Sequence, residues 1–329
     1  MRLAITGAAG MLGRKLVERL ARDRALGGEP VSSMVLVDVV PAPAGKDWDR
    51  MEIEIVVADL ARPGGIHEVL SRRPDVIFDL AAVVSGEAEA DFEKGYRVNL
   101  DATRWLFDAV RGVGGGYRPR VVFSSSIAVF GPPFPDVIGD DQATTPATSY
   151  GTQKAIAELL LSDYTRRGFL DGVAVRLPTI CVRPGEPNLA ATGFFSNIIR
   201  DPLDGRPAVL PVSADVRHWF ASPRSAVQFL VHAATLESEL IGPRRCLTMP
   251  GVTATVEMQI ESLRRTAGDD AVGLIRYEPD ESIGRMVDSW PRAFDAVRAH
   301  ELGFRAERDF DEIVRVHVED ELGGLIKSS

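Results

Sequence analysis

Short apolar runs alternate with longer amphipathic runs along the first half of the chain. The apolar runs predict buried strands at residues 2–5, 34–38, 53–58, 76–80, 120–123 and 172–177. Between them, residues 14–25, 92–111 and 150–164 repeat apolar positions every three or four residues, as amphipathic helices do. This alternation of strand and helix predicts an α/β fold with a doubly wound parallel sheet.

The pattern changes after Pro178. Prolines interrupt it at positions 178, 184, 187, 202, 207 and 211. The remaining pattern predicts short strands at 246–249 and 275–277, and helices at 194–200, 224–234, 253–266 and 310–322. We therefore expect two domains: residues 1–177 with about 215–240 in one, and residues 178–214 and 241–329 in a smaller α+β lobe.

A glycine turn joins the first strand to the first helix. Gly7, Gly10 and Gly13 stand three residues apart, with Met11 and Leu12 inside the turn. Backbone N–H groups at a helix N-terminus favour anions, and glycines let a pyrophosphate approach the backbone closely. We expect these five residues to contact a dinucleotide. The alternative is an ordinary tight turn between a strand and a helix.

Acidic residues follow two of the predicted strands. Asp38 ends the second strand, 25 residues after Gly13. A carboxylate there accepts hydrogen bonds from both ribose hydroxyls of an adenosine and repels a 2′-phosphate, which favours NAD over NADP. Asp59 could reach the adenine amino group, and Leu60 could cover the ring. The alternative for Asp38 is a solvated acid at a strand end.

Small residues follow the fourth strand. Ala81, Ala82 and Val83 allow a cofactor to pass close to the backbone, although good packing alone would also explain them. Asn99 lies inside the predicted helix 92–111, where an amide is mildly unfavourable and usually solvated. It could instead bridge strands or bind water near the site.

A tyrosine and a lysine lie four residues apart at the start of the helix 150–164. Tyr150 and Lys154 therefore share one helix face. A phenol titrates near 10, and a nearby cation lowers that pKa, which suits the pair to removing a proton from an alcohol. Ser126 ends a run of three serines, 24 residues before Tyr150, and its hydroxyl could reach the phenol. The alternatives are a half-buried tyrosine, a solvated lysine and serines that form a turn.

Composition excludes several other classes of protein. The chain has 329 residues, of which 45% are apolar, and a net charge of −9, which argues against nucleic-acid and membrane-surface partners. Two cysteines provide no disulfide framework, and five histidines form no His-x-x-x-His cluster. We expect a reduced, cytoplasmic location and no metal. Arg2 leads directly into a strand, so we expect no signal peptide, and no apolar run approaches membrane-spanning length.

Together and in this order, the motifs resemble those of the extended short-chain dehydrogenase/reductases. The resemblance covers nearly the whole chain. It rests on Gly7, Gly10, Gly13, Asp38, Asp59-Leu60, Ala81-Ala82, Asn99, Ser124-Ser125-Ser126, Tyr150 and Lys154. It implies a Rossmann domain that binds NAD and a smaller lobe that binds the substrate.

The resemblance also implies roles for individual residues. Tyr150 would be the general acid/base, and Ser126 would orient the substrate oxygen. Lys154 would bind the nicotinamide ribose and lower the pKa of the phenol. Ser124 would belong to the cofactor site, and Pro178 and Thr179 would line the nicotinamide face.

The branch of the family is suggested by local differences. Nucleotide-sugar epimerases and dehydratases commonly have Val-Tyr-Gly where this chain has Val129-Phe130-Gly131, and dehydratases have an acidic pair where Ser125-Ser126 stand. Residues 82–92, 149–155, 176–179 and 183–185 resemble dehydrogenases that use NAD to oxidise the carbon-two hydroxyl of D-erythronate, a four-carbon sugar acid. A nucleotide-sugar epimerase and a cofactor-sensing protein without turnover remain the alternatives.

An anionic sugar acid needs a cation and hydroxyl partners. Arginine grips a carboxylate at two points, and Arg183 and Arg217 are the candidates. The resemblance favours Arg217, because related sugar-nucleotide enzymes place a phosphate-binding arginine there; Arg183 could instead brace the loop after Pro178. The candidates for contacts with substrate hydroxyls are Ser85, Asn188 and Thr192.

A homodimer is expected through two helices of each subunit. The helices 92–111 and 150–164 carry apolar residues all round, including Trp105, Leu106, Phe107, Leu159, Leu160 and Leu161. An isolated chain would leave part of this surface exposed. Members of the resembling family commonly pair these helices in a four-helix contact.

Overall fold

The computed structural model describes residues 1–45, 47–48, 51–62, 64–185 and 192–325. The chain divides into two units, each built from separate segments. Unit 1 comprises Met1–Val129, Thr148–Arg176 and Val227–Thr248, and unit 2 comprises Phe130–Ala147, Leu177–Ala226 and Met249–Ser329. Which unit holds which ligand stays a prediction.

A seven-stranded sheet is the framework of unit 1. Its order is β13-β9-β7-β6-β1-β4-β5. The strands are β1 (Arg2–Thr6), β4 (Ser33–Asp38), β5 (Glu52–Val57), β6 (Val76–Asp79), β7 (Arg120–Ser126), β9 (Asp171–Leu177) and β13 (Cys246–Thr248). β1 pairs in parallel with β4 on one side and with β6 on the other, so the strand order reverses at β1. This confirms the doubly wound parallel sheet, in which ligands bind at the carboxyl ends of the strands beside the reversal point.

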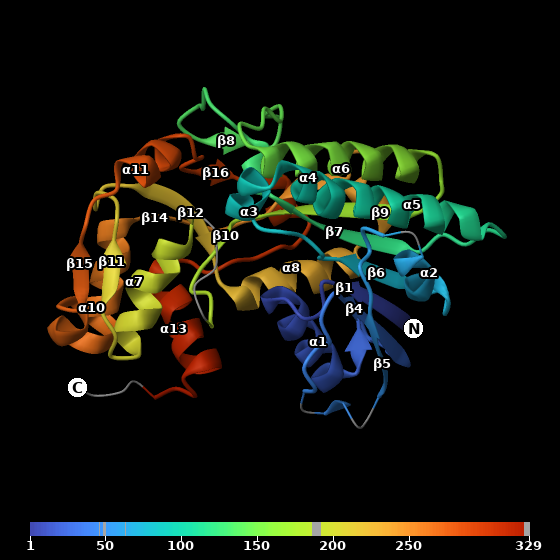
Figure 1. Ribbon diagram of the computed structural model, residues 1–329, viewed down its shortest axis with the longest axis horizontal. Helices are drawn as coiled ribbons and strands as arrows, with labels where there is room; N and C mark the ends of the chain where they lie inside the picture. The colour runs from blue at the N-terminus through green and yellow to red at the C-terminus, as the bar shows by residue number, and fades with distance from the viewer. Residues whose placement is uncertain (46, 49–50, 63, 186–191, 326–329) are drawn as a thin grey trace. The chain divides into compact units, whose positions relative to one another are not determined.

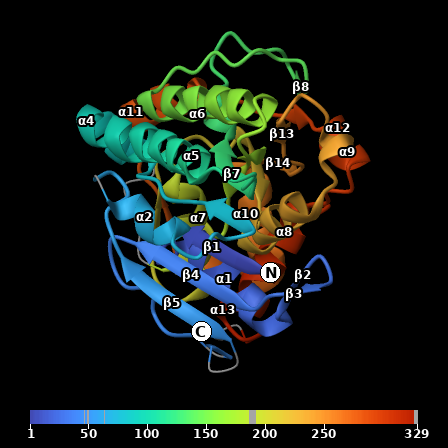
Figure 2. The ribbon, with the colours of Figure 1, turned by 90° about the vertical axis from the view of Figure 1, so that its right-hand side faces the viewer.

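Helices cover both faces of this sheet. Figures 1 and 2 show α5 (Ala102–Val113) and α6 (Ser149–Arg166) side by side along one face, with α1 (Met11–Asp23) on the other. Leu106, Phe107 and Leu161 from α5 and α6 belong to one buried apolar cluster with Ile77 and Val121 of the sheet. Burial of this apolar surface holds the two helices on the sheet.

The predicted helix 92–111 is not a uniform α-helix. It consists of α4 (Phe92–Gly95), a π-helical turn, η2 (Tyr96–Asp101), and then α5. π-Helical turns are rare in proteins, and many of those that occur lie at functional sites. Asn99 lies in the π-helical turn. The asparagine, which is mildly unfavourable inside an α-helix, therefore occupies the irregular part of the predicted helix.

Unit 2 contains three small sheets and its own core. The first sheet joins β10 (Thr179–Ile180), β12 (Arg217–Ala221) and β14 (Val252–Thr255). The second joins β11 (Ala208–Leu210) to β15 (Ile275–Tyr277), and the third joins β16 (Phe294–Asp295) to β8 (Ile138–Gly139). The core includes residues of α7 (Gly193–Leu203), α10 (Val256–Val272) and α13 (Phe310–Glu321). Phe195, Phe220, Leu263 and Phe310 are among its most deeply buried side chains.

The prediction of a helix at 253–266 is wrong at its start. Residues 253–255 belong to β14, where Val252 and Ala254 are buried and Thr253 and Thr255 are partly exposed. This two-residue period is that of a half-buried strand, and Thr255 then caps α10 by accepting a hydrogen bond from Met258 N at 3.1 Å.

Shorter elements connect these parts. They are β2 (Ala25–Leu26), β3 (Glu29–Pro30), α2 (Gly65–Leu70), α3 (Ser85–Ala90), η3 (Ile127–Val129), β8 (Ile138–Gly139), α8 (Pro223–Thr235), α9 (Ser238–Ile241), α11 (Glu281–Asp288), β16 (Phe294–Asp295) and α12 (Val297–Glu301). Apart from α8, which was predicted at 224–234, the sequence pattern did not predict them. The strands among them have two residues and the helices other than α8 have three to eight, too few positions for a recurring apolar pattern.

Candidate active site

The glycine turn after β1 has no room for side chains. Gly7 has a φ of +67°, and a Cβ there would lie 2.8 Å from the backbone N of Ala81. A Cβ on Gly13 would lie 2.2 Å from the carbonyl oxygen of Gly7. Helix α1 begins at Met11, and no side chain caps its N-terminus. These observations fit an anion-binding turn that brings the backbone close to a pyrophosphate.

Asp38 lies beside this turn. Its carboxylate accepts hydrogen bonds from Ala9 N at 2.9 Å and from Val39 N at 2.7 Å. Asp59 instead closes the turn after β5, accepting from Ala61 N at 2.9 Å and from Arg62 Nε at 3.2 Å. Leu60 packs into the core of unit 1 and is only 7% exposed.

The segment after β6 is fixed by an amide. Asn99 accepts from Val83 N at 2.8 Å and donates to Val83 O at 3.3 Å. It also donates to Gln153 Oε1 of α6 at 2.7 Å. Asn99 thus ties the segment that follows Ala81 and Ala82 to α6, rather than bridging two strands.

The start of α6 positions the tyrosine and the lysine. Thr148 caps the helix by accepting from Gly151 N at 3.0 Å, which fixes the first turn. The Lys154 Nζ lies 5.8 Å from the centre of the Tyr150 ring and donates to Ser124 O at 2.8 Å. It also lies 4.6 Å from the centre of the Phe123 ring. The structure therefore brings Tyr150, Lys154 and the end of β7 together.

Lys154 is 1% exposed, which excludes the alternative of a solvated surface lysine. Burial lowers the pKa of Lys154 to about 8, while the charges of Asp79 and Glu158 oppose that shift. Asp79 is buried as well. Burial raises its pKa, although it accepts from Thr6 Oγ1 at 2.8 Å and from Thr103 Oγ1 at 3.2 Å. A poorly hydrated cation beside a phenol has a strong electrostatic effect, because water screens it little.

The three serines at the end of β7 have different roles. Ser124 Oγ donates to Asp79 O at 3.1 Å. Ser125 Oγ donates at 2.5 Å to Glu158, whose carboxylate is gripped at two points by Arg176. Ser126 Oγ instead accepts from Ala128 N at 3.1 Å, a bond that does not use its hydroxyl proton.

Unit 2 holds the candidate residues Arg183, Thr192 and Thr179. Arg183 Nη2 donates to Thr192 Oγ1 at 2.8 Å, and Arg183 O accepts from Arg200 Nη1 at 3.1 Å. These bonds give Arg183 the bracing role that the sequence left open. Thr179, directly after Pro178, has its hydroxyl 2.6 Å from His218 Nε2. Asn188 lies outside the described residues.

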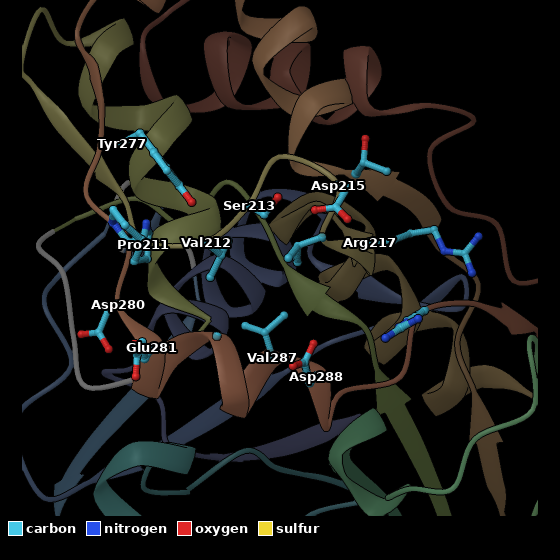
Figure 3. A pocket seen from close by; sticks show the side chains of 15 residues that line it. Pro211, Val212, Ser213, Asp215, Arg217, Tyr277, Asp280, Glu281, Val287 and Asp288 are labelled. Atoms are coloured by element: carbon cyan, nitrogen blue, oxygen red, sulfur yellow. The ribbon is translucent and has the colours of Figure 1, made fainter.

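Arg217 lines a pocket of about 600 Å³ within unit 2. Figure 3 shows Arg217 across this pocket from Asp280 and Glu281. Arg292 lines the same pocket and was not among the residues predicted from the sequence. It follows Pro291 in an irregular stretch far from Arg217 in the chain, where no periodicity or motif marks it. The pocket lining contains two arginines and four carboxylates. The carboxylates are Asp280, Glu281, Asp215 and Asp288, so the formal charge of the lining is −2.

Among the described residues, no helix is both long enough and apolar enough to cross a membrane. No group of three or more His, Cys, Asp or Glu side chains in those ranges has the arrangement of a metal site.

Comparison with known proteins gives matches over most of the chain. The model of the NAD dependent epimerase/dehydratase family matches residues 3–240. The D-erythronate dehydrogenase of Cupriavidus necator is 46% identical over 99% of this chain and 100% of its own length, and that of Haemophilus influenzae is 40% identical over 97% and 99%. A crystal structure described as the nucleoside-diphosphate-sugar epimerase from Agrobacterium tumefaciens is 60% identical, with a TM-score of 0.96 over 99% of this chain and 96% of that one.

Proposed function

The chain belongs to the NAD-dependent epimerase/dehydratase family, and within that family we propose that it oxidises the carbon-two hydroxyl of D-erythronate to a ketone with NAD. The two D-erythronate dehydrogenases similar to it match nearly their full lengths, so both units of the chain have counterparts in them. The observation in the structure that carries the proposal is the buried Lys154 beside Tyr150, at the strand end that carries Ser126. This arrangement suits proton removal from an alcohol.

The cofactor would be held by the turn after β1 and the neighbouring strand ends. Gly7, Gly10, Met11, Leu12 and Gly13 would receive the pyrophosphate, and Asp38 the adenosine ribose. When bound, NAD supplies the hydride acceptor. The remaining proposed cofactor contacts are Asp59, Leu60, Ala81, Ala82, Val83, Asn99, Ser124, Tyr150, Lys154, Pro178 and Thr179.

The proton of the alcohol would pass to Tyr150. Ser126 donates a hydrogen bond to the substrate oxygen and holds it toward the phenolate. The ammonium of Lys154 stabilises the phenolate, because a nearby cation favours the ionised form of a phenol. The same residues return the proton when the ketone is reduced.

The carboxylate of the substrate would bind Arg217. Arg217 and Arg292 line the same pocket, and two guanidinium groups suit a small anion. Ser85, Asn188 and Thr192 are the proposed partners of the substrate hydroxyls. Arg183 would act by holding Thr192 in place.

A nucleotide-sugar epimerase is the second candidate, because the similar Agrobacterium protein is described as one. A sugar nucleotide carries a diphosphate and would need cations along the pocket. The formal charge of the pocket lining is −2, and in Figure 3 Asp280 and Glu281 lie on the side of the pocket opposite Arg217. Such a lining suits a small acid near the arginines better than an extended dianion.

Supplying NAD with D-erythronate and following NADH absorbance tests the proposal. We expect NADH to form in proportion to the acid oxidised. The epimerase would bind a sugar nucleotide, return the hydride to it and accumulate no NADH. If NAD binds but neither substrate class turns over, the chain is a cofactor-sensing protein.

A homodimer and a cytoplasmic location complete the proposal. On α6, Leu159 is 71% exposed, and Phe92 in α4 is 54% exposed. Of the other residues expected at the interface, Leu106, Phe107 and Leu161 are buried within the chain itself. The dimer would therefore rest on the outer face of these helices rather than on all their apolar residues.

A further inference from the structure

Asp79 at the end of β6 is a buried acid that the proposed reaction does not use. It is 3% exposed. Its register partners in the sheet are Thr6 of β1 on one side and Phe123 of β7 on the other. Paired residues of parallel strands point to the same face of a sheet. Thr103 of α5 donates to Asp79 Oδ2 at 3.2 Å, so this face is the one that α5 and α6 cover (Figures 1 and 2).

Lys154 reaches the same part of the sheet from α6. Its Nζ lies 4.6 Å from the centre of the ring of Phe123, which is the register neighbour of Asp79. Ser124 connects the two residues. Its carbonyl oxygen accepts from Lys154 Nζ at 2.8 Å, and its hydroxyl donates to the carbonyl oxygen of Asp79 at 3.1 Å. The buried acid and the buried lysine therefore lie near each other, and their charges interact.

Two carboxylates act on the ammonium of Lys154, those of Asp79 and Glu158. The charge of Glu158 is already matched, because Arg176 of β9 donates to its two carboxylate oxygens at 2.9 and 2.8 Å. The carboxylate of Asp79 accepts from two threonine hydroxyls and, within the part of the chain that the structure describes, bonds to no cationic side chain. The uncharged groups that face the ammonium are Phe123 and Ser124 of β7 and the Tyr150 phenol of α6.

We propose that Asp79 is a positioning residue whose fixed carboxylate is the counter-charge that keeps Lys154 an ammonium, and that without this charge Lys154 no longer acts on the phenol of Tyr150. The inference rests on the proposed function for the role of Tyr150 as the base. Burial opposes both charges, since it lowers the pKa of Lys154 and raises that of Asp79. The attraction between the two charges favours the ionised form of each partner. The loss of one charge therefore favours the loss of the other.

Removal of the Asp79 charge has two opposite effects on the phenol. Directly, the loss of a nearby anion favours phenolate and lowers the phenol pKa. Indirectly, it lets Lys154 lose its proton at lower pH, and a neutral lysine does not stabilise phenolate. If Asp79 acts through Lys154, the indirect effect is the larger one and the phenol pKa rises. The sign of the change therefore separates the two routes.

Asp79→Asn removes the charge and keeps the shape of the side chain. The amide oxygen can still accept from Thr6, and the NH₂ group can donate to the Thr103 hydroxyl, whose proton can turn to the carbonyl oxygen of Asn99 at 3.4 Å. Asp75→Asn is the matched control. It makes the same change of charge at a side chain that is 47% exposed just before β6, where water screens the charge. The circular dichroism and melting temperature of each variant show whether it is folded.

The phenol is titrated without cofactor or turnover, from the ultraviolet absorbance of phenolate. The curve of the matching Tyr150→Phe variant is subtracted, so that only Tyr150 contributes. In Asp79→Asn the phenol pKa should rise by about 1–3 units, the usual effect of a neighbouring charge, toward its value in Lys154→Met. Asp75→Asn should titrate as the wild type does. In the Lys154→Met background, Asp79→Asn should cause no rise, because the lysine through which Asp79 acts is gone.

An unchanged or lowered phenol pKa in folded Asp79→Asn would overturn the proposal, and so would an equal rise in the Lys154→Met background. A second measurement needs no variant of Asp79. In the nuclear magnetic resonance spectrum of protein with isotope-labelled lysine, the Cε signal that Lys154→Met lacks reports the charge of Lys154. An ammonium at neutral pH is expected, and a neutral amine would contradict the proposal.

Turnover provides a separate readout. In Asp79→Asn, the rise of kcat for D-erythronate on the acid side of its pH profile should move to higher pH by a similar amount, because the phenolate then forms at higher pH. Asp75→Asn should keep the wild-type profile. The phenol titration and the lysine signal do not require turnover. Failure of the wild type to oxidise D-erythronate would therefore contradict the proposed function alone.

Discussion

At the scale of single residues, the burial of Lys154 determines how strongly its charge acts on the phenol of Tyr150. A lysine that is 1% exposed and bonded to Ser124 O has lost nearly all its water. The charges of Asp79 and Glu158 oppose the loss of its proton. The fold thus holds a cation at a fixed place beside the Tyr150 ring, where it acts on the phenol with little screening.

Replacement of Tyr150 with Phe tests the base directly. The substitution removes only the hydroxyl, so the first turn of α6 and the cofactor site should remain. We expect kcat for D-erythronate oxidation to fall by about 10²- to 10⁴-fold, the usual contribution of a positioned acid or base. The Kd for NAD, measured by calorimetry, should change little. Retained turnover would exclude Tyr150 as the base.

The lowered pKa of Lys154 predicts how stability depends on pH without cofactor. The folded state releases this proton at about pH 8, whereas an unfolded lysine releases it near 10.4. Between these values the unfolded state binds more protons, so stability should rise with pH. The penalty of burying the cation is fully present below about pH 8.

Lys154→Met lacks this titration and serves as the reference. Urea unfolding at pH 7.5 and pH 10 gives the free energy of unfolding of each protein. The free energy of unfolding of the wild type minus that of Lys154→Met should increase by on the order of 1–3 kcal/mol between the two pH values. A constant or decreasing difference would mean that Lys154 keeps an ordinary pKa.

At the scale of elements, the close approach of α1 to the glycine turn constrains the cofactor site. Gly13→Ala places a Cβ 2.2 Å from the Gly7 carbonyl oxygen, and backbone atoms cannot move aside without displacing the turn. We expect the Kd for NAD to rise at least about tenfold, since a displaced turn loses more than one hydrogen bond to the pyrophosphate.

Gly112→Ala is the matched control. Gly112 lies in α5, and a Cβ there would have no heavy atom within 4 Å. This variant should be about 0.5–1 kcal/mol more stable in urea unfolding, because alanine favours helix, and should bind NAD as the wild type does. Equal affinity of Gly13→Ala and wild type would place the cofactor elsewhere.

The outer face of α6 carries the proposed dimer contact. Leu159→Glu adds a charge to a side chain that is 71% exposed in the single chain. We expect light scattering to show a dimer for the wild type and a monomer for this variant at micromolar concentration. Leu240→Glu, at a 64% exposed position in α9, should leave the dimer intact. A monomeric wild type would refute the interface.

The regular elements of unit 1, and the shared helix face of Tyr150 and Lys154, could be predicted because their signals are local. Periodicity gave β1, β4 and α6, and spacing placed Tyr150 and Lys154 on one face. The π-helical turn at Asn99 could not be predicted, because no local pattern marks it and the partners of Asn99, Val83 and Gln153, come from other elements. The burial of Lys154 and the inclusion of Arg292 in the pocket depend on tertiary packing, which no window of sequence contains.

At the scale of the whole molecule, the two units have chemically different sites. Unit 1 carries the glycine turn, Asp38 and the set Ser126, Tyr150 and Lys154. Unit 2 carries the pocket lined by Arg217 and Arg292. The family assignment fits the site of unit 1. The proposal of a small acid rather than a sugar nucleotide as substrate rests on the charges that line the pocket of unit 2.

The most direct test of this account is the yield of NADH when the purified protein is mixed with limiting D-erythronate and excess NAD at alkaline pH, with a trap for the ketone. The account predicts about one NADH per molecule of acid, and much slower reaction with NADP because of Asp38. Absence of NADH with D-erythronate, together with conversion of a nucleotide sugar without net NADH, would contradict it.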